Sequence, residues 1–521
     1  MKPIYNHQTK IRFIVTLVCS GLAVTVKYLI SLVLTPYITD TLGTEAYGFV
    51  SFAKTFSDYA IIVTACLNAY AARFITIAFH KDDKKAANKY YSTVILANLA
   101  LSGIIFIISA VVIWKLDLFV NIPQNLIRDV KVLFLLDFVN YMMVATGTAF
   151  LASAYIKNRL DLVGLIKVGS YTIEAIALIV FFKNFDPKVY FVGYALIISS
   201  LVIIGLNYWM TRVMTPELSI QRKSFDFSAV RELVISGIWN SFNSLGNVLN
   251  SGLDLWISNI LLSAKAMGEL SIVKTLSTIF TTLFQVVSQP FQPILLKKYS
   301  EKDIAGVTLT LKRGIKISGY FSNMLFAGLV AVGLTYYRLW TPNQNTQFLY
   351  SVTIVTIIGS VIEGAVFPLF YVYTLTLKNR VPCIVTILSG VLNVAGMYVL
   401  LTFYHVGLYG VVGTTTVLGW FVYFIFTPLY TSHCLKISKT TFYSTLIRVI
   451  VSCVAITGCL ELLTKIYMPI SWISLILYAL VGCVMGLPIH ILITADSSDY
   501  KILFGMVKKT GKKAQDRIEG R

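Results

Sequence analysis

Fourteen long apolar runs restrict what this sequence can fold into. Each is long enough to cross a bilayer, since a spanning helix needs about 20 mostly apolar residues. Backbone groups inside a bilayer must find their hydrogen-bond partners within the segment, so each run is expected to be a helix. The expected spans are residues 13–36, 46–70, 91–114, 131–155, 162–182, 189–210, 232–256, 267–290, 315–337, 347–374, 382–403, 407–430, 441–463 and 470–493. The sequence therefore predicts an all-α integral membrane protein with 14 transmembrane helices.

Composition agrees with a membrane protein and argues against other classes. Of the 521 residues, 56% are hydrophobic and 13% are charged, whereas soluble domains carry about 25% charged residues. The formal net charge is +20, but the charges sit in short loops between apolar runs, so no nucleic-acid partner is expected. The cysteines form no C-x-x-C pair and the histidines lack metal-ligand spacing. We therefore expect no disulfide, metal site or cofactor.

The basic residues in the loops predict the orientation of the chain. If the N-terminus is cytoplasmic, 33 of the 44 Lys and Arg residues fall on the cytoplasmic side and 8 on the opposite side. Cytoplasmic loops of membrane proteins carry such an excess, so both termini are expected to be cytoplasmic. The longest connections are expected at 71–90, 211–231 and 291–314, and all three are basic. Three lysines remain inside spans: Lys27, Lys54 and Lys274.

An internal repeat predicts the domain organisation. Leu42–Ser57 matches Leu262–Ser277 at an offset of 220 positions, with seven identities, and Asp83 matches Asp303 at the same offset. Such copies are typical of transporters built from two lobes around a central substrate site. The expected parts are an N-lobe with spans 1–6 (1–211), a basic cytoplasmic linker (212–231), a C-lobe with spans 7–12 (232–432), spans 13 and 14 (433–493), a basic cytoplasmic tail (494–517) that contacts anionic lipid, and a protease-recognition sequence left from expression (518–521).

The three intramembrane lysines predict an anion site. At 1.5 Å rise per residue, all three lie about 10–14 Å below the outer surface, and cations at that depth need a partner or a water-filled site. Lysine is suited to phosphate, so a diphosphate bound by Lys27, Lys54 and Lys274 is the functional interpretation. The structural alternative pairs Lys54 with Asp58, and Lys27 or Lys274 with Asp137, Glu174 or Glu363.

Polar side chains at helical spacing accompany the lysines. Steps of three and four residues place them on one face of each helix, which is expected to line a cavity. The cavity-lining candidates are Ser31, Ser51, Asp58, Ser271, Thr278 and Gln285. Candidates for ion coupling are the other buried polar groups, Asp137, Glu174, Asp254, Glu363 and Asn393. Within this set, Asp254, Asn393 and residues 414–416 offer oxygen ligands for a monovalent cation.

Two stretches resemble a known transporter superfamily. Pro36–Gly48, PYITDTLGTEAYG, is similar to the first-loop pattern of the multidrug/oligosaccharidyl-lipid/polysaccharide (MOP) exporter superfamily. Phe150–Asp161, FLASAYIKNRLD, resembles the end of the fourth span of that family. The number and order of spans match over nearly the whole chain, most closely in the polysaccharide-transporter branch of Wzx-type flippases. Related peptidoglycan-precursor flippases place arginines in spans 1, 2 and 8, where this chain has lysines and lacks several further arginines.

The resemblance implies a flippase of the bacterial inner membrane. Its substrate would be an undecaprenyl-diphosphate-linked oligosaccharide, such as an O-antigen, capsule or exopolysaccharide repeat unit, moved by alternating access. The chain contains no nucleotide-binding G-x-x-x-x-G-K-[ST] motif, so we expect no enzyme activity and coupling to a Na⁺ or H⁺ gradient or the membrane potential. Expected partners are the lipid-linked glycan, the bilayer and other polysaccharide-assembly proteins, and the chain is expected to be a monomer. The alternatives are a cation-coupled multidrug antiporter of the same superfamily and a membrane glycan polymerase or ligase.

Overall fold

The protein is all-helical throughout the residues that the structure describes. The computed structural model describes residues 7–496 and residue 499, and these contain helices but no strand. Thirteen helices in this range are long and apolar enough to cross a membrane. The described residues divide into two compact units, residues 7–276 with 379–415 and residues 277–378 with 416–496 and 499. The all-α membrane fold predicted from the apolar runs is confirmed.

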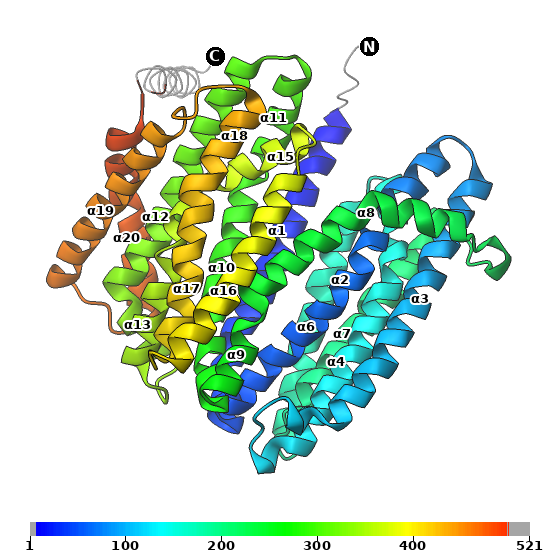
Figure 1. Ribbon diagram of the computed structural model, residues 1–521, viewed down its shortest axis with the longest axis horizontal. Coiled ribbons are helices and arrows are strands. Elements are labelled where there is room, and N and C mark those ends of the chain that lie inside the picture. The colour runs from blue at the N-terminus through cyan, green and yellow to red at the C-terminus, as the bar shows by residue number, and fades with distance from the viewer. Residues whose placement is uncertain (1–6, 497–498, 500–521) are drawn as a thin grey trace, which may run out of the picture. The chain divides into compact units, whose positions relative to one another are not determined.

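The first unit contains the helices that carry the predicted lysines (Figure 1). Its helices are α1 (His7–Leu42), α2 (Thr44–His80), α3 (Lys84–Trp114), α4 (Ile127–Gly147), α5 (Ala152–Ile156), α6 (Leu160–Asn184), α7 (Phe191–Met214), α8 (Phe227–Asn247), α9 (Asp254–Leu261), the start of α10 (Ala264–Ser288), α16 (Arg380–Thr402) and the start of α17 (Leu408–Trp420). Extensive packing joins α1 to α6 and α2 to both α3 and α8. These pairs hold the helices of the candidate site in register.

The second unit is organised around one long helix, α12 (Ile304–Trp340). Around it pack α19 (Tyr443–Ile466), α20 (Trp472–Thr494), α14 (Ser360–Val366), α13 (Thr346–Ile357) and α11 (Phe291–Ser300). The remaining helices of the unit are the end of α10, α15 (Tyr371–Leu375), the end of α17 and α18 (Thr427–Leu435). Buried side chains such as Val307, Leu311, Leu446 and Val449 join α12 to α19 in one apolar core.

The span expected at 232–256 is irregular. It consists of α8, a π-helical turn at Val248–Gly252 and α9, and no stretch of it is among the thirteen apolar helices. The reason lies in its sequence, since asparagines and serines recur along α8. π-helical turns inside helices are frequent at functional sites. The count of fourteen spans and the cytoplasmic termini remain predictions.

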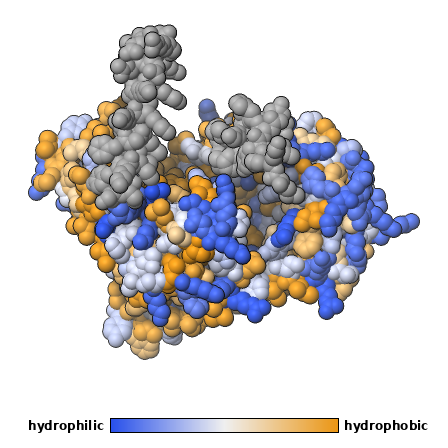
Figure 2. Space-filling model, turned by 90° about the horizontal axis from the view of Figure 1, so that it is seen from above, coloured by the Kyte–Doolittle hydropathy of each residue, from blue (hydrophilic) through white to orange (hydrophobic). Residues whose placement is uncertain are grey.

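Two of the expected basic loops are largely helical, so the loop predictions at 71–90 and 291–314 were wrong in extent. The loops reduce to short turns at Lys81–Asp83 and Glu301–Asp303. Asp83 accepts a hydrogen bond from the Ala86 amide at 2.8 Å, and Asp303 accepts one from the Gly306 amide at 2.7 Å. An aspartate at the N-cap stabilises a helix by about 1 kcal/mol, which lets helices continue through basic sequence. Figure 2 shows hydrophilic residues interspersed with hydrophobic ones on the face that it draws.

The internal repeat extends to local backbone structure. The residue before each capping aspartate is left-handed, with φ of 59° at Asp82 and 58° at Lys302. A second pair of irregular segments follows at an offset of 219: 3₁₀ turns at Thr148–Leu151 and Phe367–Phe370, each leading into a five-residue helix. Irregular segments at matching positions of the two copies do not follow from apolar composition. Their recurrence supports duplication of the fold.

Candidate functional site

The packing of α1 against α6 positions Lys27. A methyl group added at Gly164 would lie 2.9 Å from the backbone of Cys19, so the two helices approach closely there. Seven residues further along α6, the ring of Tyr171 lies 5.7 Å from the Lys27 ammonium group. Lys27 is eight residues beyond Cys19, so α1 and α6 run parallel in near register. Such a cation–π contact leaves the ammonium group available to other partners.

The second lysine, Lys54, is close enough to Lys27 for the two ammonium groups to interact electrostatically. The strongest electrostatic interaction on Lys27 is with Lys54, followed by Glu174, Lys167 and Asp58. The side chains of Lys27, Lys54 and Asp58 are all exposed. Within the described residues, neither Lys27 nor Lys54 forms an ion pair, so the predicted Lys54–Asp58 pair is not made. Two neighbouring cations that form no ion pair within the described residues can bind an anion.

The third predicted lysine, Lys274, has a different environment. Its ammonium group donates to the Asp254 carboxylate at 2.9 Å and to the carbonyl of Ser251. The Asp254 side chain is only 8% exposed and that of Lys274 is 24% exposed. The partner is therefore Asp254 rather than the acids Asp137, Glu174 or Glu363 considered from the sequence. This pair neutralises Lys274 and fixes α10 against α9.

Direct contacts join the two copies of the repeated stretch. A methyl group at Gly48 would lie 2.8 Å from the Cα of Gly268. The Tyr47 hydroxyl lies 2.7 Å from the Thr275 hydroxyl and accepts a hydrogen bond from Thr35 at 3.1 Å. The beginnings of α2 and α10 are thus packed backbone to backbone, six residues, or about 9 Å along each helix, before Lys54 and Lys274.

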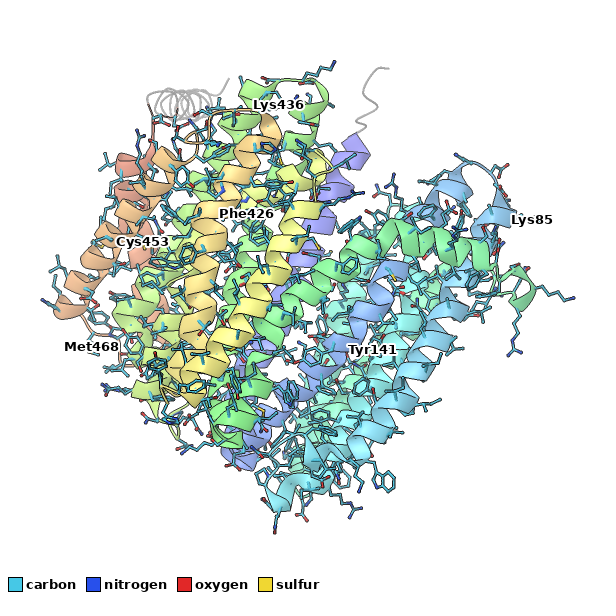
Figure 3. All side chains as sticks on the ribbon, in the orientation of Figure 1. Lys85, Tyr141, Phe426, Lys436, Cys453 and Met468 are labelled. Carbon is cyan, nitrogen blue, oxygen red and sulfur yellow. The ribbon has the colours of Figure 1, made fainter. Side chains whose placement is uncertain are left out.

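Two predicted coupling residues lie near the lysines. Asp137 is 3% exposed, and one of its buried carboxylate oxygens has no hydrogen-bond partner among the described residues. Its electrostatic neighbours are Ser57, Asp58 and Lys54. One turn further along α4, the hydroxyl of Tyr141, labelled in Figure 3, donates to the Ala60 carbonyl at 2.9 Å.

Glu174, on α6, is half-buried and interacts with Ser199, Lys27 and Lys54. The structure therefore brings together Lys27, Lys54, Asp58, Asp137 and Glu174, as a cluster of lysines and carboxylates on α1, α2, α4 and α6.

The other sequence-derived candidates have separate surroundings. The Asn393 side chain donates to the Asn250 carbonyl at 2.8 Å and accepts from the Thr415 hydroxyl at 3.1 Å. The Asp254 carboxylate accepts a hydrogen bond from Lys274. Ser31 and Ser51 are half-buried, and Ser271 is buried with its hydroxyl bonded to the carbonyl of Met267. In the second unit, Thr278 and Gln285 are exposed on α10, and Glu363 is half-buried on α14 near Tyr423.

Sequence reasoning missed one cation of the cluster, Lys167. It lies one turn before Tyr171 on α6, is exposed and interacts electrostatically with Lys27. Lys167 falls within the span expected at 162–182 but is not among the three lysines predicted to lie inside spans. The spacing of Lys167, Tyr171 and Glu174, at steps of four and three, places them on one helix face and was the available signal.

Comparisons with known proteins agree on the fold and the family. A family model described as "Polysaccharide biosynthesis protein" matches residues 17–297. The chain is 28% identical over 455 residues to the uncharacterized membrane protein EpsK of Bacillus subtilis (strain 168), covering 86% of this chain and 88% of that protein.

Two solved transporter structures share the fold of this chain. An inward-facing multidrug resistance MATE family transporter of the MOP superfamily matches with a TM-score of 0.69 and 14% identity, covering 79% of this chain and 96% of that one. The lipid II flippase MurJ, in an inward closed conformation, matches with a TM-score of 0.67 and 13% identity, covering 92% of this chain and 99% of that one. The predicted MOP fold and its polysaccharide branch are confirmed.

Proposed function

Because this chain belongs to the polysaccharide biosynthesis protein family and is a multi-pass membrane protein of the MOP superfamily, we propose that it is a flippase for an undecaprenyl-diphosphate-linked oligosaccharide. The substrate would be a repeat unit of a surface polysaccharide, loaded on the cytoplasmic side of the bacterial inner membrane. The shared fold of the lipid II flippase MurJ supports a lipid-linked substrate. Alternating access of the two repeats around a central site would carry the headgroup across.

The adjacency of Lys27 and Lys54 is the observation that carries the proposal. The two ammonium groups repel each other, and neither has a direct ion pair in the described chain. A diphosphate bound between them would replace this repulsion with charge-assisted hydrogen bonds, each about 1.5–3 kcal/mol. Lys167 extends the same positive surface by about one helical turn. Lys274 is paired with Asp254. Its role in the site is therefore to hold α10 against α9, and it does not make the first contact with the substrate.

Export of the native glycan tests the role of the lysine pair. The Lys27→Gln/Lys54→Gln variant is expressed in a strain that lacks its own copy, with Lys183→Gln as the control, since Lys183 is an exposed lysine at the end of α6. We expect surface glycan to fall at least about tenfold in the double variant and lipid-linked glycan to accumulate on the cytoplasmic leaflet. Wild-type export by the double variant at equal protein level would contradict the proposal.

The carboxylates of the cluster supply a coupling site and also define the alternative function. Asp58, Asp137 and Glu174 would exchange protons or Na⁺ as the lysines bind and release the anion. The same three carboxylates, together with the MATE-like fold, are the observation in favour of a cation-exporting multidrug antiporter. Efflux of a cationic dye from energised vesicles separates the two functions: the flippase moves lipid-linked glycan and leaves the dye distribution unchanged.

A further inference from the structure

The helix α8 carries a polar stripe that the proposed diphosphate site does not use. The stripe follows steps of four, three, four and four residues, so its members share one face of the helix. They are Ser236, Asn240, Asn243, Asn247 and Ser251. All five residues are exposed. In the part of the chain that the structure describes, the side-chain amides of the three asparagines make no hydrogen bond. The contacts along the stripe are made by Ser251, whose hydroxyl donates to the Asn247 carbonyl and whose carbonyl accepts from Lys274.

The other sides of α8 are occupied or apolar. One side packs on α2, where a methyl group at Gly237 would lie 2.0 Å from the Cys66 carbonyl oxygen. Another packs on α16, where a methyl group at Gly246 would lie 2.8 Å from the Thr386 side chain. A third side exposes the apolar side chains of Ile235, Ile238 and Phe242. Lipid chains are suited to the apolar side, whereas three unpaired amides facing lipid would each cost several kcal/mol. The stripe is therefore a surface for water or a polar ligand.

The stripe leads to the level of the lysines. Gly237 lies against Cys66, and the Tyr59 hydroxyl donates to the Gly252 carbonyl at 2.6 Å, so α2 and α8 run antiparallel. The two contacts are 15 residues apart on α8 and its π-helical turn but only seven apart on α2, so α8 is inclined to α2. The contact of Tyr59 with Gly252 places the end of the stripe five residues, about 8 Å along α2, from Lys54. At the end of the stripe, the carbonyl of Ser251 accepts a hydrogen bond from Lys274.

We propose that this stripe binds the glycan of the substrate, an inference that rests on the proposed flippase function. A sugar chain attached to a diphosphate at Lys27 and Lys54 would extend along α8 from Asn247 to Ser236. Amide groups both donate and accept hydrogen bonds, which matches the hydroxyl and acetamido groups of sugars. The helix contains no charged residue from Leu233 to Leu253. The stripe itself therefore offers amides and hydroxyls but no charge, so its contacts with a sugar would be hydrogen bonds.

Separate measurements of diphosphate binding and glycan export test the assignment. The variant Asn240→Leu/Asn243→Leu removes two amides while keeping the branched shape and the number of side-chain heavy atoms. Phe242→Leu, on the apolar side of the same helix, controls for general changes to α8. Binding is measured with farnesyl diphosphate, which carries the diphosphate but no sugar, and export is measured on the native glycan in a strain that lacks its own copy. We expect the asparagine variant to lose about tenfold or more in export, and its farnesyl diphosphate affinity to stay within about twofold of wild type.

The outcomes separate this inference from the function on which it rests. Wild-type export by the asparagine variant overturns the glycan surface, while loss of farnesyl diphosphate binding in Lys27→Gln/Lys54→Gln would still support the flippase. Equal losses of export and of farnesyl diphosphate binding in the asparagine variant also overturn it, because they indicate a structural role. If neither set of variants changes binding or export, the proposed function itself fails. Should the double asparagine variant not fold, Asn243→Ser is tested by the same criteria.

Discussion

Gly48 and Gly268 lie in contact, although 220 residues separate them in the sequence. A methyl group at Gly48 would lie 2.8 Å from the Gly268 Cα, and one at Gly268 would lie 2.2 Å from the carbonyl oxygen of Thr44. The two glycines occupy the same position in the two copies of the repeat. The stretch that marks the duplication is therefore also the place where the copies meet, and glycine is required because backbone packs on backbone.

Alanine at this crossing should destabilise the protein. Gly268→Ala pushes its methyl group into backbone, which cannot move aside as a side chain can, and overpacking of this kind costs about 1–3 kcal/mol. Gly169→Ala is the control, because its methyl group meets nothing within 4 Å. Thermal unfolding of the purified variants measures the difference. Equal midpoints for the two variants would show that the crossing relaxes without cost.

The Lys274–Asp254 pair should behave as a buried ion pair. Removing one partner leaves a buried charge without compensation, which costs about 3–5 kcal/mol. Lys274→Met should therefore lower the unfolding midpoint more than the double variant Lys274→Met/Asp254→Leu does. A double-mutant cycle on thermal stability measures the coupling. Additive effects of the two substitutions would contradict a direct pair and return Lys274 to the set of lysines available to an anion.

Reciprocal amide contacts between Asn121 and Asn259 predict a further stabilising site. The backbone N–H of Asn121 donates to the Asn259 side-chain oxygen at 2.7 Å, and the Asn259 side-chain NH₂ donates to the Asn121 backbone carbonyl at 3.1 Å. Asn259 is fully buried, so Asn259→Ala leaves buried groups unpaired, at about 1–3 kcal/mol. Asn184→Ala is the control, since Asn184 is exposed and bonds only to its own helix. Unfolding curves that coincide for both variants would refute the role of the contact.

An ion-pair network in the second unit predicts sensitivity to acid. Lys316 donates to Asp496 at 2.5 Å and to Asp499 at 2.7 Å, and Arg448 donates to Asp496 at 2.5 Å. The hydrogen bond from Lys316, and then that from Arg448, holds the pKa of Asp496 below its ordinary value of 3.8. Burial acts to raise the pKa of Asp499, but the hydrogen bond and charge of Lys316 keep it below the ordinary value.

A carboxylate with a depressed pKa stabilises the folded state above its unfolded pKa, and that stability is lost as the pH falls below about 3.8 through the folded pKa. The free energy of unfolding of the wild-type protein should therefore fall as the pH is lowered below about 4. The drop should be smaller in Asp496→Asn, by up to about 1 kcal/mol, because Asp496 is half exposed to solvent. Unfolding midpoints across this range measure both proteins. Identical acid dependence in the variant would remove Asp496 from the network.

The apolar runs, the repeat and the presence of lysines at membrane depth all follow from sequence alone. Each depends on local periodicity and composition, because a bilayer requires about 20 apolar residues per span whatever its neighbours are. The family likewise follows from short motifs such as Pro36–Gly48 together with the order of the spans. The polar stripe on α8 was also visible as a periodic pattern, but its meaning depends on which sides of the helix are covered.

The tertiary structure decided which charges meet. Lys274 pairs with Asp254, whereas Lys54 does not pair with the carboxylate one turn away on its own helix, and Lys167 joins Lys27. These partners depend on the rotation and crossing of helices, which close contacts such as those at Gly164 and Gly268 fix to within an ångström or so. Spacing along one helix places a side chain on a face, and only the packing of several helices determines what that face meets.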